Sequence, residues 1–243
     1  MKIPKMLLAL AASVLAISGT AIAQDDDHGL YTVRATTVIP GKGQEYQELM
    51  AKLATSRKAA GHSGVNMWQV VRGPASTFYT VTDAEKYADL AGPFDSGMSD
   101  GDWQRWLSRI VDVIDHSVVT TLRTHGELAI TAESGGAPNM VLLRYSVLKP
   151  GTGDDHHEWL GESLVPALKA GNGRGWSVSD VRLGEDVNTW ISATRIDSWE
   201  QMDGPGPLSH MSERARNNLL DDYFERVESS RTELIRHLPD LSY

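Results

Sequence analysis

Arg34-Ala-Thr-Thr-Val-Ile-Pro40-Gly41-Lys-Gly43 is the stretch that decides the fold of this chain, because it returns as Arg144-Tyr-Ser-Val-Leu-Lys-Pro150-Gly151-Thr-Gly153. Pro150 follows Pro40 by 110 residues, and the arginine, the proline and both glycines keep their register. Proline cannot donate to a strand ladder and glycine tolerates positive φ, so each copy predicts a strand that ends at Pro-Gly. The chain is therefore expected to contain two related halves.

A helical pattern follows each Pro-Gly. Tyr46, Leu49 and Leu53 share one helix face in the first half, and apolar residues from Trp159 to Leu168 do so in the second. Pro166 falls inside the second of these helices and predicts a kink or an early end. The other elements are expected as strands at 65–72, 77–82, 118–130, 176–183, 188–195 and 231–238 and as helices at 84–90, 103–114 and 215–227.

Each half thus has the order β-α-β-β-α-β of a ferredoxin-like unit. We predict an α+β fold of two tandem ferredoxin-like repeats, at 30–130 and 140–243, joined by a linker at 131–139. A single four-stranded sheet of this kind leaves one face uncovered. The two repeats are expected to bury these faces together as an intramolecular α/β barrel of the dimeric type.

The first 23 residues have two lysines, a short apolar run and small residues up to Ala23, which predicts a secretory signal peptide before a polar tail at 24–29. Zero cysteines fit an oxidising compartment, so the mature chain is expected to be periplasmic or secreted. The apolar run is too short and too diluted for a membrane span.

Lys2 and Lys5 leave with the leader, so 21 of the 23 basic residues remain against 32 acidic ones, a formal charge of −11. Nucleic acid is excluded as a partner on this charge. Small molecules and further copies of the chain, as a homo-oligomer, remain as partners.

The Pro40 to Gly43 motif, followed by Glu45, Tyr46 and Leu49 on a helix, resembles the opening of NIPSNAP-like and antibiotic-biosynthesis-monooxygenase-like domains of the dimeric α/β-barrel superfamily. The second copy, Pro150 to Gly153, is looser. The resemblance covers both halves, so one chain would supply both halves of a barrel that smaller relatives build from two subunits. It implies a binding fold whose members include cofactor-independent monooxygenases and haem enzymes of the chlorite dismutase type. It assigns no catalytic residue here.

Arg34 and Arg144 are the first candidates for a ligand site. The strand face with Val33 and Ala35, and its counterpart with Leu143, is the more apolar and is expected to meet the helices, which would turn both arginines into the barrel or its mouth. There they would bind an anionic ligand or pair with an internal carboxylate such as Glu127, Asp180 or Glu233.

Seven tryptophans against three phenylalanines predict either a tryptophan-rich core or an aromatic pocket. In the second reading the polar groups that would orient a ligand are histidines or a tyrosine. The residues proposed to line such a pocket are Trp68, Trp176, Trp190, His62, Tyr79 and His156.

Asp154-Asp155-His156-His157-Glu158 has the composition of a metal site, but neither histidine has a second ligand one turn later on the helix. Ligation would need groups from elsewhere in the fold, so no metal is expected. No tightly held cofactor is expected either. Haem is the alternative, and the histidines conceivable as its axial ligands are His116, His125, His210 and His237.

These features predict an exported barrel protein that binds, and in one version converts, a small hydrophobic or aromatic molecule without a tight cofactor. As an enzyme it would be a cofactor-independent monooxygenase. The competing class is a non-catalytic envelope protein that uses the scaffold for protein contacts.

Overall fold

A computed structural model describes residues 29–243 except 85, 92–93, 133–135, 172 and 174. The predicted leader and residues 24–28 of the polar tail lie outside the described residues. The first half contains β1 (Leu30–Val38), α2 (Gly43–Ala59), β2 (Val65–Arg72), β3 (Thr77–Ala84), η1 (Tyr87–Ala91), α3 (Asp100–Ile110), β4 (Ile114–Thr124) and the 3-10 helix η2 (Gly126–Leu128).

The second half repeats this order with a broken first helix. It contains β5 (Met140–Leu148), α4 (Gly153–Trp159), the π-helix η3 (Leu160–Leu164), α5 (Val165–Ala170), β6 (Trp176–Leu183), β7 (Thr189–Ile196), α6 (Glu200–Asp203), α7 (Glu213–Arg226), β8 (Val227–His237) and η4 (Pro239–Leu241). No helix of the described residues is long and apolar enough to cross a membrane.

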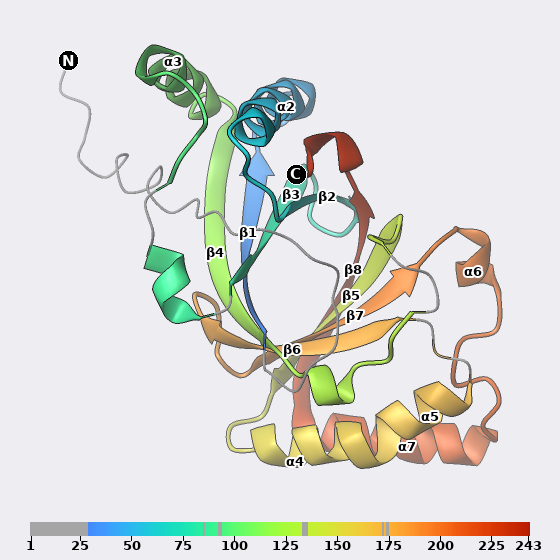
Figure 1. The fold of residues 1–243 in the computed structure, drawn as a ribbon. Helices are drawn as coiled ribbons and strands as arrows, with labels where there is room; N and C mark the ends of the chain where they lie inside the picture. Colours follow the sequence, from blue (N-terminus) through green and yellow to red (C-terminus); the bar gives the residue numbers. More distant parts are fainter. Residues whose placement is uncertain (1–28, 85, 92–93, 133–135, 172, 174) are drawn as a thin grey trace.

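All eight strands close into one antiparallel barrel in the order β1-β3-β2-β8-β5-β7-β6-β4 (Figure 1). This confirms the predicted α+β barrel. The two halves meet at two seams. β2 pairs with β8, where Trp68 is opposite His237, and β4 pairs with β6, where Arg123 is opposite Asp180. Neither seam joins strands that are adjacent in the chain.

Helices cover the outside of the barrel in two groups (Figure 1). α2 and α3 pack against the strands of the first half around Tyr46, Leu53, Phe78 and Trp106. α4, α5 and α7 pack against those of the second half, in a cluster that includes Trp159, Leu168, Trp176, Trp190, Leu219 and Tyr223. A third cluster fills the barrel itself, with side chains that include Val33, Ala35, Trp68, Tyr79, Val141, Leu143 and Ile235.

The predicted orientation of the first strand of each half is therefore wrong. Val33 and Ala35 face the barrel interior, whereas Val38 packs in the cluster under the helices of the first half. The physical reason is that one face of each of these strands meets the helices and the other meets the barrel interior, and both faces carry apolar residues. A small residue such as Ala35 fits the crowded interior, so the more apolar face is not the one that meets the helices.

Pro166 does not end its helix early, because the helix continues through it to Ala170. It has no backbone N–H to donate, and α4 ends at Trp159, widens into the π-turn η3 and resumes as α5 with Pro166 in its first turn. The predicted last strand of the first half, 118–130, ends early, because the chain turns into η2 after His125.

Candidate functional site

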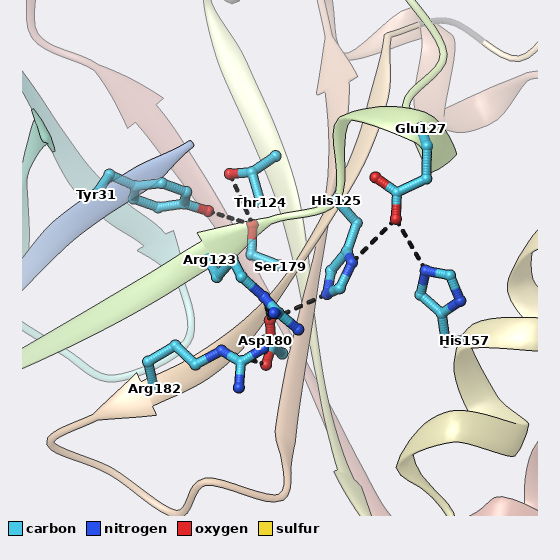
Figure 2. A network of polar contacts seen from close by, with 9 residues as sticks. All are labelled: Tyr31, Arg123, Thr124, His125, Glu127, His157, Ser179, Asp180 and Arg182. Carbon is cyan, nitrogen blue, oxygen red and sulfur yellow. Dashed lines mark hydrogen bonds and ion pairs between the residues drawn. The ribbon is translucent and has the colours of Figure 1, made fainter. Parts of the chain in front are cut away.

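Asp180 anchors a polar network on the outside of the β4–β6 seam (Figure 2). Its carboxylate accepts from Arg123 Nε at 3.1 Å, contacts Arg182 Nε at 2.9 Å and lies 3.0 Å from His125 Nε2. The strand register places Arg123 opposite Asp180, which explains the first contact. Because buried carboxylates are stable only when paired, this set of partners accounts for the burial of Asp180.

Glu127 joins this network to α4. Its Oε1 atom lies 3.2 Å from His125 Nδ1 and 2.9 Å from His157 Nε2 (Figure 2). Partial burial alone would raise the pKa of Glu127, but hydrogen bonds to His157 and His125 hold this pKa below its usual range. The carboxylate is therefore charged at neutral pH and bridges a residue after β4 to a residue of α4.

His156, the neighbour of His157, points into the core instead. Its ring lies 5.5 Å from that of Trp159 and 5.3 Å from that of Trp190, measured between centroids. Burial lowers the pKa of His156 to about 4, and Arg226 and His157 act in the same direction. Trp190 in turn stacks on His125 at 4.7 Å. The rings of His125, Trp190, His156 and Trp159 thus form a continuous row from the Glu127 network to Trp159 at the end of α4.

Next to Trp159, a groove of about 230 Å³ lies between α4, η3 and α7. Two donors there, Trp159 Nε1 and Arg226 Nε, are buried and have no hydrogen-bond partner within the part of the chain that the structure describes. The guanidinium of Arg226 lies 6.0 Å from the Trp159 ring centroid. The groove is lined by Asp155, Glu158, Trp159, Glu162, Ser163, Asp222 and Arg226.

The π-turn builds one wall of this groove. Glu162 and Ser163 belong to η3, and the wider turn follows from Pro166 two residues beyond it. π-turns inserted in helices occur frequently at functional sites. The groove therefore combines unpaired buried donors with a helix irregularity.

Four predicted pocket residues lie on the second-half side of the barrel. Trp176 and Trp190 belong to the core cluster beneath α4 and α7, and His156 contacts Trp190. Arg144 lies with its guanidinium 6.0 Å from the ring centroid of Tyr223, a member of the same cluster. The two tryptophans are packed as core residues.

Trp68 and Tyr79 come together elsewhere, as opposite residues of β2 and β3 inside the barrel. The Tyr79 hydroxyl donates to Glu233 Oε2 at 2.6 Å, and burial raises the pKa of Tyr79. Arg231 Nε donates to Glu233 Oε1 at 3.2 Å. One of the carboxylates predicted to be internal is thus paired, but with Arg231 instead of Arg34 or Arg144.

Arg34 and His62 lie apart from these groups. Arg34 donates to Ser117 Oγ at 3.3 Å on the helix-covered face of β1, and burial lowers the pKa of Arg34. His62 Nε2 lies 3.0 Å from Asp95 Oδ2 near the surface. The expectation that both repeated arginines enter the barrel is wrong, since the alternation along β1 and β5 turns them outward.

Residues that sequence reasoning missed dominate the groove. The sequence marks Trp159 only as a helix residue and one of seven tryptophans, and Arg226 only as part of a helix; their unpaired nitrogens become visible only when α4 and α7 are placed side by side. No local spacing connects Glu127, which follows β4, to His157 on α4, because 30 positions of sequence separate them.

The structure is similar to several solved structures over most of its length. An anthrone oxidase-like protein matches with a TM-score of 0.57 at 17% identity, covering 88% of this chain and 92% of the other. A proposed monooxygenase from Lactobacillus acidophilus matches with a TM-score of 0.55 at 11% identity, covering 87% and 94%. The chain has the dimeric α/β-barrel fold.

A chlorite dismutase from Candidatus Nitrospira defluvii, in complex with imidazole, shares this fold with a TM-score of 0.52 at 12% identity, covering 88% of this chain and 93% of the other. No family model matches the sequence, and no curated relative matches it. The similarity to these proteins is therefore evident in the fold, although the sequence identity is low.

The resemblance to chlorite dismutases implies haem, which needs a histidine nitrogen facing a space of porphyrin size. His116 and His210 are exposed surface residues, and both nitrogens of His125 contact carboxylates. His237 lies against Trp68 and contacts Ser242 Oγ through Nε2. The ring of His156 is enclosed by Trp159 and Trp190. The arrangement of these residues does not fit a haem.

Proposed function

We propose that this protein binds a small hydroxylated molecule in the groove between α4, η3 and α7, without a tightly held cofactor. The observation that carries this proposal is that Trp159 and Arg226 line the groove and that each has a buried donor, Nε1 and Nε, with no acceptor in the described part of the chain. A buried donor without a partner costs about 1–3 kcal/mol. A ligand oxygen that accepts from both donors would recover this cost.

The rim of the groove supports a ligand with hydroxyl groups. Four acidic residues, Asp155, Glu158, Glu162 and Asp222, line the groove together with Trp159 and Arg226. A simple anion would be repelled by them, whereas hydroxyl groups donate to carboxylates while their own oxygens accept from the indole and the guanidinium. The polar lining favours such a molecule, phenols included, over a purely hydrophobic one.

The size of the groove supports a small ligand. Its volume of about 230 Å³ is below the range of about 300–1,000 Å³ typical of sites for drug-sized molecules. The names of the similar solved structures, an oxidase-like protein, a proposed monooxygenase and a chlorite dismutase, are those of proteins that act on small molecules. They support this class of ligand over a macromolecule.

The proposal places the binding site in the second of two fused ferredoxin-like repeats of an exported protein. The repeated element order supports the tandem arrangement, and the pattern of residues 1–23 together with the lack of cysteine supports export. The mass of the mature protein recovered from the periplasm or medium tests the predicted cleavage before Gln24.

Binding is tested by calorimetric titration of the purified protein with a set of small phenols and polyols. We expect at least one compound to bind once per chain. Trp159→Phe and Arg226→Lys should each weaken that binding about fivefold to tenfold, the loss that corresponds to a hydrogen bond of about 1–1.5 kcal/mol. Trp199→Phe is the matched control, because Trp199 is half-exposed and lies outside the groove. Equal binding by all variants would contradict the proposal.

A further inference from the structure

His125, Glu127 and His157 form a cluster that is separate from the groove. His125 Nδ1, Glu127 Oε1 and His157 Nε2 all lie within 4.8 Å of one another. They come from two segments, since His125 and Glu127 frame the start of η2 and His157 lies on α4 (Figure 2). We infer that these three side chains form a binding site for a divalent transition-metal ion such as Zn²⁺.

The three ligand atoms already lie near the spacing that a metal ion needs. Ligand atoms around a tetrahedral Zn²⁺, with bonds of about 2.0–2.2 Å, lie about 3.4 Å apart. Glu127 Oε1 is 3.2 Å from His125 Nδ1 and 2.9 Å from His157 Nε2. The third pair of atoms, His125 Nδ1 and His157 Nε2, lies within 4.8 Å.

His125 is held in the orientation that a metal ligand needs. Its other nitrogen, Nε2, contacts Asp180 Oδ1 at 3.0 Å, which makes the carboxylate–histidine–metal arrangement common in metalloproteins. Asp180 is fixed in turn by Arg123 and Arg182. Trp190 stacks on the imidazole with an interplanar angle of 9°. Nδ1 is therefore directed toward Glu127 by a supporting shell built from β4, β6 and β7.

The donor set determines the class of ion. Two imidazoles and one carboxylate suit Zn²⁺, Fe²⁺ and related ions, whereas Ca²⁺ and Mg²⁺ prefer oxygen ligands. The side chains of Glu127 and His157 are 44% and 40% exposed, so solvent reaches the cluster. Three protein ligands leave a coordination position for water, which is typical of catalytic zinc sites and not of structural ones.

The alternative is a carboxylate that only ties η2 to α4 through two histidine hydrogen bonds. Calorimetric titration of the purified protein with ZnCl₂ separates the two. The metal site predicts one Zn²⁺ per chain and no binding of Mg²⁺ at the same concentration. His157→Ala and Glu127→Gln should reduce the Zn²⁺ affinity at least about 100-fold, and Asp180→Asn, which acts through His125, about 10–100-fold.

His116→Ala is the matched control, because His116 is an exposed histidine 2.9 Å from the carboxylate of Asp115 but lies outside the cluster. It should leave the Zn²⁺ affinity unchanged. Circular dichroism checks that each variant is folded, and His157 is exposed enough for its removal to be tolerated. Absence of a one-to-one Zn²⁺ site in the unaltered protein, or equal affinity in His157→Ala, would overturn the inference.

The visible absorption spectrum of bound Co²⁺ provides a second test, because a hydrogen bond between the side chains would not produce it. Visible absorption bands of Co²⁺ bound by two imidazoles and a carboxylate should appear on titration and disappear on addition of excess Zn²⁺. The bands should be retained in His116→Ala and lost in His157→Ala. Bands of equal intensity in both variants would show that Co²⁺ binds elsewhere.

Discussion

At the scale of single residues, two carboxylates are buried and each is stabilised by several hydrogen-bond partners. Asp180 is paired by Arg123, Arg182 and His125 on the outside of the barrel. Glu233 is almost fully buried within it and accepts from Tyr79 and Arg231. Strand register supplies only the Arg123–Asp180 contact; the other partners lie two residues along the same strand, across the barrel interior or, for His125, just after β4, and together their hydrogen bonds offset the cost of burial.

Replacing Glu233 tests how far the stability of the protein depends on the hydrogen bonds of this carboxylate. Glu233→Leu leaves the Tyr79 hydroxyl without its acceptor and removes the partner of Arg231, so we expect the free energy of unfolding to fall by about 3 kcal/mol. Glu228→Leu is the control, because Glu228 is exposed on the same strand and should change stability by less than about 0.5 kcal/mol. Urea unfolding followed by tryptophan fluorescence measures both. Equal stability of the two variants would contradict the assigned role of Glu233.

His237 should make stability depend on pH. Its ring lies 4.7 Å from that of Trp68, and burial lowers the pKa of His237 below its usual value. The unfolded chain therefore binds a proton at higher pH than the folded one. The contribution of His237 to the free energy of unfolding is fully present above about pH 6.5, the usual pKa of histidine. It is lost as the pH falls toward the lowered pKa of the folded protein.

The measurement compares urea unfolding of the unaltered protein and of His237→Gln at pH 7.5 and pH 5.5. Acidification should destabilise the unaltered protein more than the variant, which cannot take up this proton. A parallel loss in both proteins would show that carboxylates alone cause the pH dependence.

At the scale of elements, the β4–β6 seam brings together the Asp180 network and depends on one glycine. Gly184 has φ +106°, and a Cβ there would lie 2.2 Å from the carbonyl oxygen of Val119 on β4. The close approach of the β6–β7 turn to β4 leaves no space for a side chain, so glycine is needed for both its conformation and its size.

Gly184→Ala should therefore lower the free energy of unfolding by more than about 3 kcal/mol, since strain and displacement of the seam add. Gly41→Ala is the control, with φ +85° but open space around the added carbon, and should cost about 1–2 kcal/mol from the left-handed conformation alone. Thermal and urea unfolding give both values. A Gly184 variant no less stable than the Gly41 variant would show that the seam tolerates the extra carbon.

The repeat at an offset of 110 residues, with the periodicity of each segment, predicts the order of the elements. Pro166 predicts a kink or an early end, but not the π-turn η3 that precedes it or the continuation of the helix as α5. The faces of β1 and β5 could not be predicted, because alternation identifies a strand but not which of two buried faces lies inside a barrel. For the site, helix spacing gives His157 no second ligand within α4, so the sequence predicts that any ligation needs groups from elsewhere in the fold. The partners of His157 follow β4, and their proximity arises from the β4–β6 seam, which no local pattern encodes.

At the scale of the whole molecule, neither half closes a barrel alone. The pairs β2–β8 and β4–β6 both cross between the halves, and the interior cluster joins Trp68 and Tyr79 of the first half to Val141 and Ile235 of the second. Each isolated half would expose two strand edges and an apolar sheet face.

We therefore expect a fragment of residues 29–130 to form dimers or larger species, whereas the full chain unfolds in one cooperative transition. Size-exclusion chromatography with light scattering measures the oligomeric state of the fragment. Urea unfolding of the full chain is cooperative if the transitions followed by fluorescence and by circular dichroism coincide. A stable, folded monomer of the fragment would contradict the shared interior.

The central claim, that the groove beside α4 binds a small hydroxylated molecule, is tested most directly by the indole N–H signal of Trp159. Nitrogen–proton correlation NMR resolves the indole signals, and Trp159→Phe identifies the one that belongs to this residue. Titration with a compound that binds should move the Trp159 signal downfield and saturably, as its N–H gains an acceptor, and leave that of Trp199 in place. A ligand that binds while the Trp159 signal stays unchanged would contradict the account.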